Sequence, residues 1–204
     1  MTKKDVLKPQ LWTPRPVAET IAVYADWAET YDAEVQKRGY RTPERLSKAL
    51  ADVVDPSTTV LDFGCGTGLS GVALKDAGFQ TLHGTDVTPE MLEKATASGL
   101  YEKTWASTPE DPAFGKGAYK AIAAIGVVSL GAAPPETLAM LVGKLDTGDI
   151  LAMSYNEPTL QDARYIKALD DEVASGHVEV IFRENGPHLE DVGMTSDVII
   201  LRHK

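Results

Sequence analysis

One short stretch, VLDFGCGTGLSG at residues 60–71, constrains the fold of this chain more than any other. An apolar run ends at Phe63, and Gly64, Gly66 and Gly68 then alternate with single residues before a helical pattern begins. Glycines after a strand allow a tight turn and let a ligand approach the backbone closely. The N–H groups at the start of the following helix are free to bind that ligand. The stretch therefore predicts a strand–turn–helix unit that holds a ligand at the turn.

An acidic residue completes this predicted site. Asp86 ends the next apolar run, TLHGTD, about 20 residues after the turn. A carboxylate at this strand end can accept hydrogen bonds from two ribose hydroxyls. The strand, the turn, the helix and the acid together indicate a site for a cofactor that contains adenosine.

The rest of the chain alternates between strand and helix patterns, which predicts a parallel sheet covered by helices on both faces. We expect helices at residues 17–39, 42–54, 68–78, 88–99, 134–145 and 160–176, and seven strands at residues 58–63, 81–86, 103–106, 119–128, 149–155, 177–185 and 195–204. About nine residues without a helical pattern join the last two strands. This connection favours an antiparallel pair at the end of the sheet.

A chain of 204 residues suits a single domain. Three prolines predict an extended arm at residues 1–16, followed by the domain at residues 17–204. Within it we expect a cap of N-terminal helices at residues 17–57 and a Rossmann-like α/β core at residues 58–204. Thr-Pro-Glu at residues 42–44 is typical of a helix start, with the threonine as N-cap and the proline in the first turn.

The composition limits the partners of the chain. The formal net charge is −10, and an acidic surface repels phosphate backbones, so nucleic acid is not expected as a partner. The single cysteine, Cys65, excludes an internal disulfide and favours a reducing compartment. No apolar run reaches the length of a membrane span, and the N-terminus lacks the apolar segment of a signal peptide. We therefore expect a cytoplasmic protein.

Two kinds of cofactor fit a glycine turn of this type. Residues 66–71, GTGLSG, match the dinucleotide pattern G-x-G-x-x-G. In a dinucleotide site, however, the first glycine closes the strand. Counting from Gly64 then puts Leu69 at the third glycine position, where its side chain would hinder a pyrophosphate. The chain also lacks room for a separate substrate domain, so an NAD-dependent oxidoreductase is the less favoured alternative.

Four segments resemble a known family. VLDFGCGTG at residues 60–68 resembles motif I of the class I S-adenosylmethionine-dependent methyltransferases, and GTDVTPEMLEKA at residues 84–95 resembles the motif that follows. LDTGDILAMSYNE at residues 145–157 resembles the LKPGG turn and fifth strand of the family. YADWAETYDAEV at residues 24–35, with RTPERL after it, is most similar to the Williams–Beuren-region methyltransferase-like subgroup, which is of the small-molecule type. The resemblance covers about residues 20–204.

The resemblance implies a seven-stranded sheet with an antiparallel last strand, S-adenosyl-L-methionine as cofactor and S-adenosyl-L-homocysteine as product. It implies that the glycine turn holds the methionine part, Asp86 the ribose and Val87–Thr88 the adenine, and that Tyr31 lies over the cofactor. We expect Cys65 to be a small residue in a tight turn and not a nucleophile. The implied cofactor-binding residues are Tyr31, Trp27, Asp62, Gly64, Cys65, Gly66, Thr67, Gly68, Leu69, Asp86, Val87, Thr88, Met91, Ala106, Ser107, Ile125 and Gly126.

The chain departs from the pattern of this family at three places. The fourth strand opens with Tyr119–Lys120 where the family has an aromatic residue and an aspartate. Ser107 stands where the third strand usually offers an acid to the adenine amine. Asp146, Thr147 and Asp149 depart from the LKPGG turn before the fifth strand. Neither of the first two changes touches the methionine end, so we expect cofactor binding to persist.

The sequence carries fewer signals for the acceptor. Because the carboxyl ends of strands line ligand crevices, the candidate substrate-binding residues are Tyr155 and Asn156, together with Tyr24 and with His188 in the last loop. Tyr40 is expected in the wall of the pocket. The segment after the fourth strand lacks the Asn/Asp-Pro-Pro-aromatic motif of enzymes that methylate nucleic-acid bases or protein glutamine. No pattern indicates a general base or a metal site, so the catalytic residues stay unassigned.

These patterns predict a methyltransferase that acts by proximity and orientation. A sulfonium is an activated methyl donor, so the protein need only hold the donor and the nucleophile in line and exclude water. We expect transfer to a small O-, N- or S-nucleophile. The alternative is a protein that binds S-adenosylmethionine or S-adenosylhomocysteine without turnover. The sequence indicates neither the acceptor nor the oligomeric state.

Overall fold

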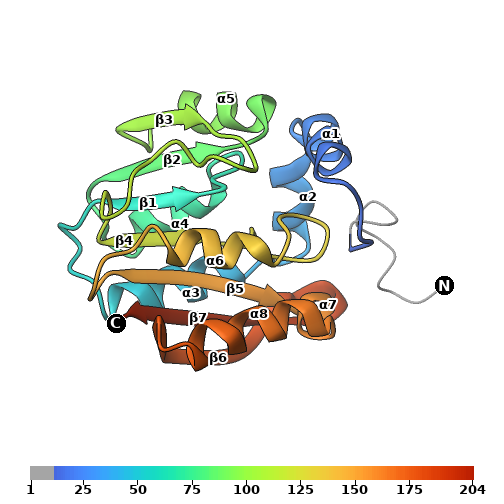
Figure 1. The fold of residues 1–204 in the computed structure, drawn as a ribbon. Coiled ribbons are helices and arrows are strands. Elements are labelled where there is room, and N and C mark those ends of the chain that lie inside the picture. Colours follow the sequence, from blue (N-terminus) through green and yellow to red (C-terminus); the bar gives the residue numbers. More distant parts are fainter. Residues whose placement is uncertain (1–11) are drawn as a thin grey trace.

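The computed structural model describes residues 12–204, which form a seven-stranded sheet with helices on both faces (Figure 1). The first eleven residues of the predicted arm lie outside the described residues, so the arm stays a prediction. None of the helices within residues 12–204 is long and apolar enough to cross a membrane. The predicted Rossmann-like α/β fold is confirmed.

The strands follow the order β3-β2-β1-β4-β5-β7-β6 across the sheet. They are β1 (Val60–Phe63), β2 (Leu82–Asp86), β3 (Lys103–Ala106), β4 (Ala121–Ala124), β5 (Ile150–Asn156), β6 (Val178–Leu189) and β7 (Met194–His203). β7 runs antiparallel to β5 and to β6, as predicted for the last strand. The order reverses between β1 and β4, and loops diverge at such a point to leave a crevice beyond the carboxyl ends of the strands.

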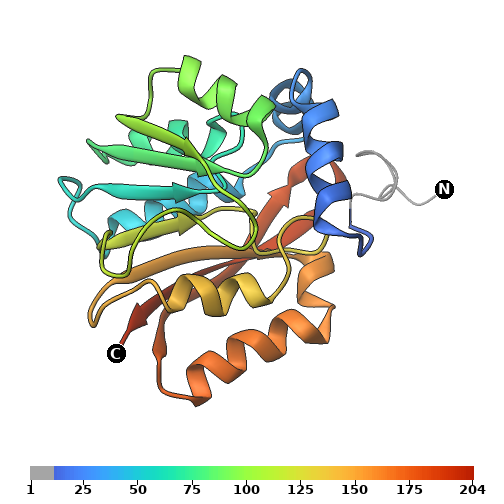
Figure 2. The same ribbon diagram turned by 45° about the horizontal axis from the view of Figure 1, so that its top comes forward.

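Helices cover both faces of the sheet. They are α1 (Val17–Trp27), α2 (Tyr31–Lys37), α3 (Thr42–Ala51), α4 (Leu69–Asp76), α5 (Pro89–Ala97), α6 (Glu136–Val142), α7 (Glu157–Leu160) and α8 (Ala163–Ala174). Alternate strand residues enter two cores, as expected for a sheet buried on both faces. Leu61 and Ile122 pack with α6 and α8, whereas Val60 and Ala121 pack with α3 and α4. Figure 2 shows α6 and α8 in front of the sheet.

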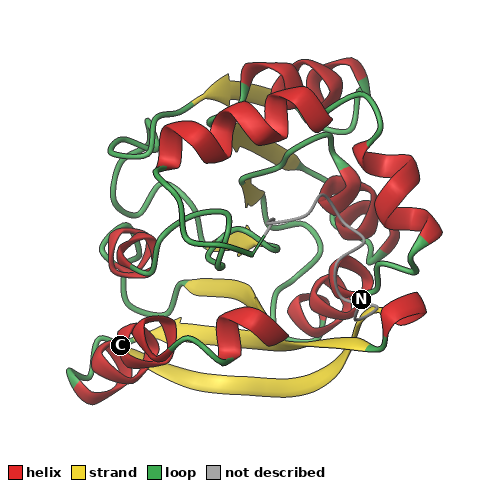
Figure 3. Ribbon diagram, turned by 90° about the vertical axis from the view of Figure 1, so that its right-hand side faces the viewer, coloured by secondary structure: helices red, strands yellow, loops and turns green. Residues whose placement is uncertain are grey.

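Helices α1 and α2 lie beyond the carboxyl ends of the parallel strands (Figure 1), and Figure 3 views this end of the molecule. The prediction of one helix over residues 17–39 was wrong, because the structure has a break at residues 28–30. Trp27 ends α1 and is 1% exposed, and its ring meets the ring of Tyr31 edge-on at 4.8 Å between centroids. Both rings join one cluster with Leu189 and Met194. This tertiary packing overrides the helical periodicity of the segment.

The fourth strand is shorter than predicted. β4 ends at Ala124 because the chain leaves the sheet there and turns at Gly126, which has a left-handed φ of 73°. Sequence patterns also missed α7, a single turn of helix directly after β5. The Oδ1 of Asn156 accepts a hydrogen bond from the N–H of Thr159 at 3.1 Å and so caps this short helix.

Thr42 has a different role from the predicted N-cap. Arg41 occupies the N-cap position, and Thr42 is the first residue of α3. The Oγ1 of Thr42 lies 2.8 Å from Nδ1 of His188 and 2.7 Å from Oγ of Ser196. The hydroxyl therefore joins α3 to β6 and β7 instead of capping the helix.

Two of the predicted departures from the family pattern compensate for each other. Lys120, directly before β4, forms an ion pair with Asp149 directly before β5, at 3.1 Å between Nζ and Oδ1. Asp149 is 2% exposed and also accepts the N–H of Asp146 at 2.8 Å. A buried carboxylate needs such partners, so the lysine and the aspartate stabilise the start of adjacent strands together.

Candidate cofactor and acceptor site

The glycine turn joins β1 to α4 at the carboxyl end of the sheet. Gly64, Gly66 and Gly68 have φ angles of 72°, 53° and 102°, in the region that L side chains rarely adopt. A Cβ on Gly64 would collide with the side chain of Val127, whereas a Cβ on Gly66 would have nothing within 4 Å. The turn is therefore packed against the β4 loop at Gly64 and open at Gly66, which lines a cavity.

Asp86 ends β2 and faces this turn. Its two carboxylate oxygens accept hydrogen bonds from the N–H groups of Gly66 and Thr88, each at 2.8 Å. Burial raises the pKa of Asp86, and the backbone hydrogen bonds oppose that shift. An ionised carboxylate has about four lone-pair sites, so Asp86 keeps acceptor capacity for a ligand in the cavity.

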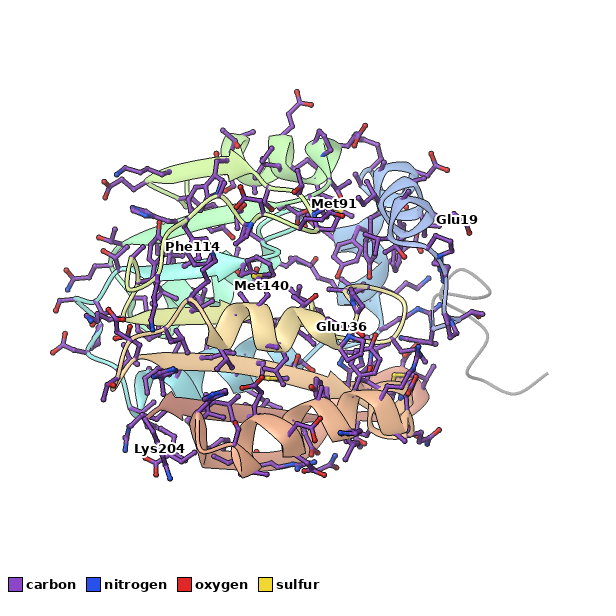
Figure 4. The ribbon with its side chains drawn as sticks, in the orientation of Figure 1. Glu19, Met91, Phe114, Glu136, Met140 and Lys204 are labelled. Atoms are coloured by element: carbon purple, nitrogen blue, oxygen red, sulfur yellow. The ribbon has the colours of Figure 1, made fainter. Side chains whose placement is uncertain are left out.

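One cavity extends from the glycine turn to helix α1. The ends of β1, β2 and β4, the segment after β3, and the side chains of α1 and α2 form its wall. Met91 of α5 lies at this end of the sheet (Figure 4). The wall brings together these residues predicted to bind a ligand: Tyr24, Tyr31, Gly64, Cys65, Gly66, Thr67, Leu69, Asp86, Val87, Thr88, Met91, Ser107, Ile125 and Gly126.

Four residues predicted to bind the cofactor lie off this wall. Trp27 is buried behind Tyr31. A Cβ on Gly68 would face Ala95, Leu100 and Tyr101. Ala106 ends β3 one residue before the cavity-lining Ser107, and Asp62 lies within β1, before the turn.

Asp62 belongs to a buried network that supports the turn. Its Oδ2 accepts hydrogen bonds from the hydroxyls of Ser70 at 2.6 Å and Tyr101 at 2.7 Å. Its Oδ1 is buried and has no partner within the described part of the chain. Burial raises the pKa of Asp62 to about 6, while the two hydroxyls oppose the shift. Loss of either hydroxyl would leave this buried carboxylate with fewer hydrogen bonds and would therefore destabilise it.

The ring of Tyr101 occupies space that two glycines leave free. A Cβ on Gly71 would lie 2.6 Å from Cζ of Tyr101, and a Cβ on Gly84 would lie 3.0 Å from its Cδ1. Gly71 therefore accommodates Tyr101 and does not line the cavity, whereas the Leu69 side chain does. Sequence analysis missed Tyr101, although two glycines on neighbouring elements are the signal that a ring packs between them.

Three residues predicted to bind substrate lie away from the cavity. Tyr155 is fully buried, and its hydroxyl donates to the carbonyl of Tyr165 at 3.3 Å. Asn156 caps α7. His188 belongs to β6 and not to a loop, and burial lowers its pKa to about 4, so its ring is neutral near pH 7. Of the four predicted residues, Tyr24 lines the cavity.

A further set of residues lines the same cavity and forms what we call the acceptor wall. These residues come from α1, from the segment around the start of α3, from the loop between β4 and α6, and from the first turn of α6. They are Val17, Thr20, Ile21, Tyr24, Tyr40, Pro43, Val127, Ala132, Ala133, Pro134 and Thr137. Sequence analysis proposed only the two tyrosines among them. The others carry no motif, because only the packing of distant segments brings them together.

The remaining sequence candidates show no sign of covalent or metal chemistry. Burial raises the pKa of the Cys65 thiol far above its usual range, so the thiol stays protonated. This protonated state is unlike that of a cysteine nucleophile. Over residues 12–204, no three His, Cys, Asp or Glu side chains are grouped so that they could hold a metal ion.

The cavity residues fit an adenosine-type cofactor. Gly66 leaves the backbone open, Asp86 retains lone pairs, and Val87 and Met91 offer an apolar surface next to them. A dinucleotide fits less well, because the side chain of Leu69 lines the wall where a pyrophosphate would need a glycine.

Residues 60–145 match a family model described as a methyltransferase domain. The chain is also 35% identical over 123 residues to methyltransferase-like protein 27 of Homo sapiens. That alignment covers 58% of this chain and 50% of the human protein. The chain thus spans about half the length of this curated relative.

Two solved structures share the fold along nearly the whole chain. One is the putative methyltransferase of Haloferax volcanii in complex with the activator Trm112, with 19% identity, a TM-score of 0.67, and coverage of 93% of this chain and 99% of that chain. The other is the [4+2]-cyclase SpnF, with 15% identity, a TM-score of 0.66, and coverage of 94% and 98%. At these identities the similarity shows the fold alone.

The sheet, the glycine turn and the match to a methyltransferase domain over residues 60–145 support the predicted class, the class I S-adenosylmethionine-dependent methyltransferases. The curated relative that the chain is similar to is methyltransferase-like protein 27. This match confirms the predicted resemblance to methyltransferase-like proteins.

Proposed function

We propose that the protein transfers a methyl group from S-adenosylmethionine to a small-molecule acceptor bound in the same cavity. One observation carries this proposal. The wall that begins at the glycine turn and Asp86 continues without interruption into the acceptor wall of α1 and the β4–α6 loop. A donor and an acceptor bound there would meet near the ends of β1 and β4, between Gly64 and Gly126.

In this proposal, backbone groups and Asp86 bind the cofactor. Asp86 accepts hydrogen bonds from the ribose hydroxyls, and the turn from Gly64 to Thr67 holds the methionine part. Val87, Met91 and Ser107 surround the adenine. The charge of Asp86 is supported by two backbone N–H groups, which fix the direction of its free lone pairs before the ligand binds.

The chemistry requires little of the protein beyond position. S-adenosylmethionine supplies a methyl group that is already activated by the positive sulfur. Transfer would form a bond from the acceptor to the methyl carbon and break the carbon–sulfur bond, with its electron pair left on sulfur. Tyr24, Tyr31 and the apolar residues of the acceptor wall hold the two molecules in line and exclude water.

Calorimetric titration with S-adenosylmethionine, S-adenosylhomocysteine and NAD in parallel tests the cofactor. We expect micromolar binding of the first two compounds and none of NAD. Binding of NAD alone, or no binding of any of the three by folded protein, would overturn the proposal.

A second candidate is a protein that binds the cofactor without turnover. It is favoured by one observation: within residues 12–204, Asp86 is the only charged side chain on the cavity wall, so the wall offers no evident general base. The [4+2]-cyclase with the same fold is a reminder that the fold does not fix the reaction. Binding of S-adenosylhomocysteine, combined with no S-adenosylhomocysteine production across a panel of thiols, phenols and amines, would favour this second candidate.

Other features of the proposed biology rest on the sequence. A net charge of −10 supports a small molecule over nucleic acid as the acceptor. A cytoplasmic location and the absence of a membrane partner also stay predictions.

A further inference from the structure

The seven tyrosines of the chain fall into two groups. Four have hydrogen-bonded hydroxyls: Tyr101 with Asp62, Tyr119 with His83, Tyr155 with the carbonyl of Tyr165, and Tyr165 with the carbonyl of Ala133. The other three, Tyr24, Tyr31 and Tyr40, line the cavity. None of these three hydroxyls has a hydrogen-bond partner among residues 12–204. All three side chains are half-buried and line the cavity, so a ligand bound there can supply the missing hydrogen-bond partner.

The three rings are held in defined positions around the cavity. Tyr24 and Tyr31 lie 6.3 Å apart between ring centroids, and Tyr31 also rests against Trp27. Tyr40 pairs with Leu189 in an isolated bridge, and its ring meets that of His188 edge-on at 5.2 Å. The hydroxyl of Tyr40 lies only 3.0 Å from the position that a Cβ on Gly126 would take. Tyr40 therefore reaches the end of β4, where the two halves of the cavity meet.

These hydroxyls act as hydrogen-bond donors. Burial raises the pKa of Tyr24 to about 12, with Asp86 adding to the shift. Burial also raises the pKa of Tyr31 and Tyr40 well above the usual value, and neighbouring tyrosines add to it. All three phenols are thus protonated near pH 7, and they present O–H groups to the cavity.

The rest of the acceptor wall sets the polarity of its ligand. Apart from Tyr24 and Tyr40, Thr20 and Thr137 are its only polar side chains in the described part of the chain. Among residues 12–204, no side chain that lines the cavity carries a positive charge, and the one carboxylate, Asp86, lies on the cofactor side and is bonded to two backbone N–H groups. An acceptor with a permanent charge on its body would lose hydration there without a partner.

We infer, building on the proposed function, that the acceptor is a small apolar molecule with a weakly acidic O–H or S–H group, a phenol or a thiol, whose oxygen or sulfur is bound by the hydroxyls of Tyr40 and Tyr24. The acceptor releases its proton to water, so its anion is the nucleophile. A bond forms from this oxygen or sulfur to the methyl carbon, the bond from that carbon to the sulfonium breaks, and the electron pair remains on the sulfur of S-adenosylhomocysteine. The products are a neutral methyl ether or thioether and a neutral cofactor.

The acidity of the acceptor follows from the wall. No described residue there is suited to take a proton, so the acceptor must ionise without help near neutral pH. Thiols of pKa about 8.5 and phenols of pKa about 10 ionise to a useful extent, whereas simple alcohols do not. A protonated amine would be repelled by the sulfonium, while a thiolate or phenolate would be attracted to it. Donor hydroxyls stabilise the anion further.

Equilibrium binding of 4-nitrophenol tests this inference, because its anion and its neutral form absorb at different wavelengths. The protein is first saturated with sinefungin, a cofactor analogue that carries a positive amine and no transferable methyl group. We expect the anion to bind, and we expect Tyr40→Phe to weaken its binding about tenfold, with a smaller loss for Tyr24→Phe. Tyr119→Phe is the matched control, because Tyr119 lies before the start of β4, away from the cavity at the carboxyl ends of the strands, and its hydroxyl bonds His83. This variant should bind the anion as the wild type does.

Two results would overturn the inference. The first is that 4-nitroanisole, which lacks the hydroxyl, binds as tightly as 4-nitrophenol. The second is that the Tyr40→Phe and Tyr24→Phe variants both bind the anion as well as the wild type does. Thermal unfolding shows whether each variant is folded, and either tyrosine variant suffices for the test. A parallel titration with 4-nitrothiophenol decides between phenol and thiol, and tighter binding of its anion assigns the thiol. Failure of S-adenosylhomocysteine to bind the wild type would instead refute the proposed function, so the two failures are distinguishable.

Discussion

The two walls of the cavity are built in different ways. The cofactor side comes from consecutive strand ends and is fixed by the backbone, since N–H groups of Gly66 and Thr88 both bind Asp86. The acceptor wall comes from α1, Tyr40 and the β4–α6 loop, which are far apart in the sequence, and it presents side chains. The comparison teaches that a ligand held by the backbone is specified by a local motif. A ligand held by side chains is specified by how distant segments pack.

Of the substitutions that test the difference between the two walls, we expect the largest effect on ligand affinity at Asp86. Asp86→Ala removes a charged acceptor for the ligand and leaves the N–H groups of Gly66 and Thr88 without a partner. We expect the affinity for S-adenosylhomocysteine to fall roughly 100-fold, because each hydrogen bond to a charged group contributes about 1.5–3 kcal/mol. Calorimetric titration measures this loss.

Asp76→Ala is the matched control, because Asp76 is exposed at the end of α4, and its affinity should be unchanged. A folded Asp86→Ala variant that binds as the wild type does would contradict the assignment. If Tyr40→Phe lowered the affinity for S-adenosylhomocysteine as much as Asp86→Ala does, the two walls would not bind separate ligands.

The comparison also explains what could be predicted from the sequence. The seven strands, most of the helices, the glycine turn and the position of Asp86 at the end of β2 follow from periodicity and from short spacings, so the sequence predicted them correctly as elements of the fold. Tyr155 and Asn156 were placed at the correct strand end, but the sequence does not say which way a side chain points. Both point away from the cavity, one buried under α8 and the other capping α7.

The missed parts all depend on long-range contacts. The break between α1 and α2 has no glycine or proline to mark it, and it arises from the packing of Trp27 and Tyr31. Tyr101 supports the turn from beneath, yet its partner Asp62 lies 39 residues earlier. Thr42 is a residue type that often caps helices, but its hydroxyl forms hydrogen bonds with His188 and Ser196 instead.

Asp62, which lies beneath the glycine turn, is expected to make the stability of the fold depend on pH. Its folded-state pKa of about 6 lies above the unfolded value of about 3.9, so the folded protein binds this proton more tightly. The resulting stabilisation is complete below pH 4 and is lost as the pH rises through 6. We expect the free energy of unfolding of the wild type, relative to Asp62→Asn, to fall by about 2 kcal/mol between pH 4 and pH 7. Urea unfolding of both proteins across this range measures it, and a constant difference would refute the raised pKa.

A substitution at Gly71 tests whether this residue supports the glycine turn or contacts a ligand. A Cβ at this position would press on the ring of Tyr101, so we expect Gly71→Ala to lower the free energy of unfolding by about 2 kcal/mol. Gly143→Ala is the matched control, because a Cβ there would be 3.4 Å from the nearest atom and should leave stability unchanged or raised. If Gly71→Ala left stability intact and abolished nucleotide binding, Gly71 would face a ligand, and the dinucleotide alternative would regain support.

The smallest expected effect concerns the anchoring of the acceptor wall. Tyr40 precedes α3, and the Thr42 hydroxyl ties the start of that helix to His188 and Ser196. Thr42→Val keeps the shape of the side chain but leaves the buried Nδ1 of His188 without a partner, which should lower the free energy of unfolding by about 1 kcal/mol. Thr42→Ser retains the hydroxyl and should restore most of this loss in the same urea titration. Affinity for S-adenosylhomocysteine should be equal in both variants, because the bond lies on the acceptor side, and a loss of that affinity in Thr42→Val alone would show that the two walls are coupled.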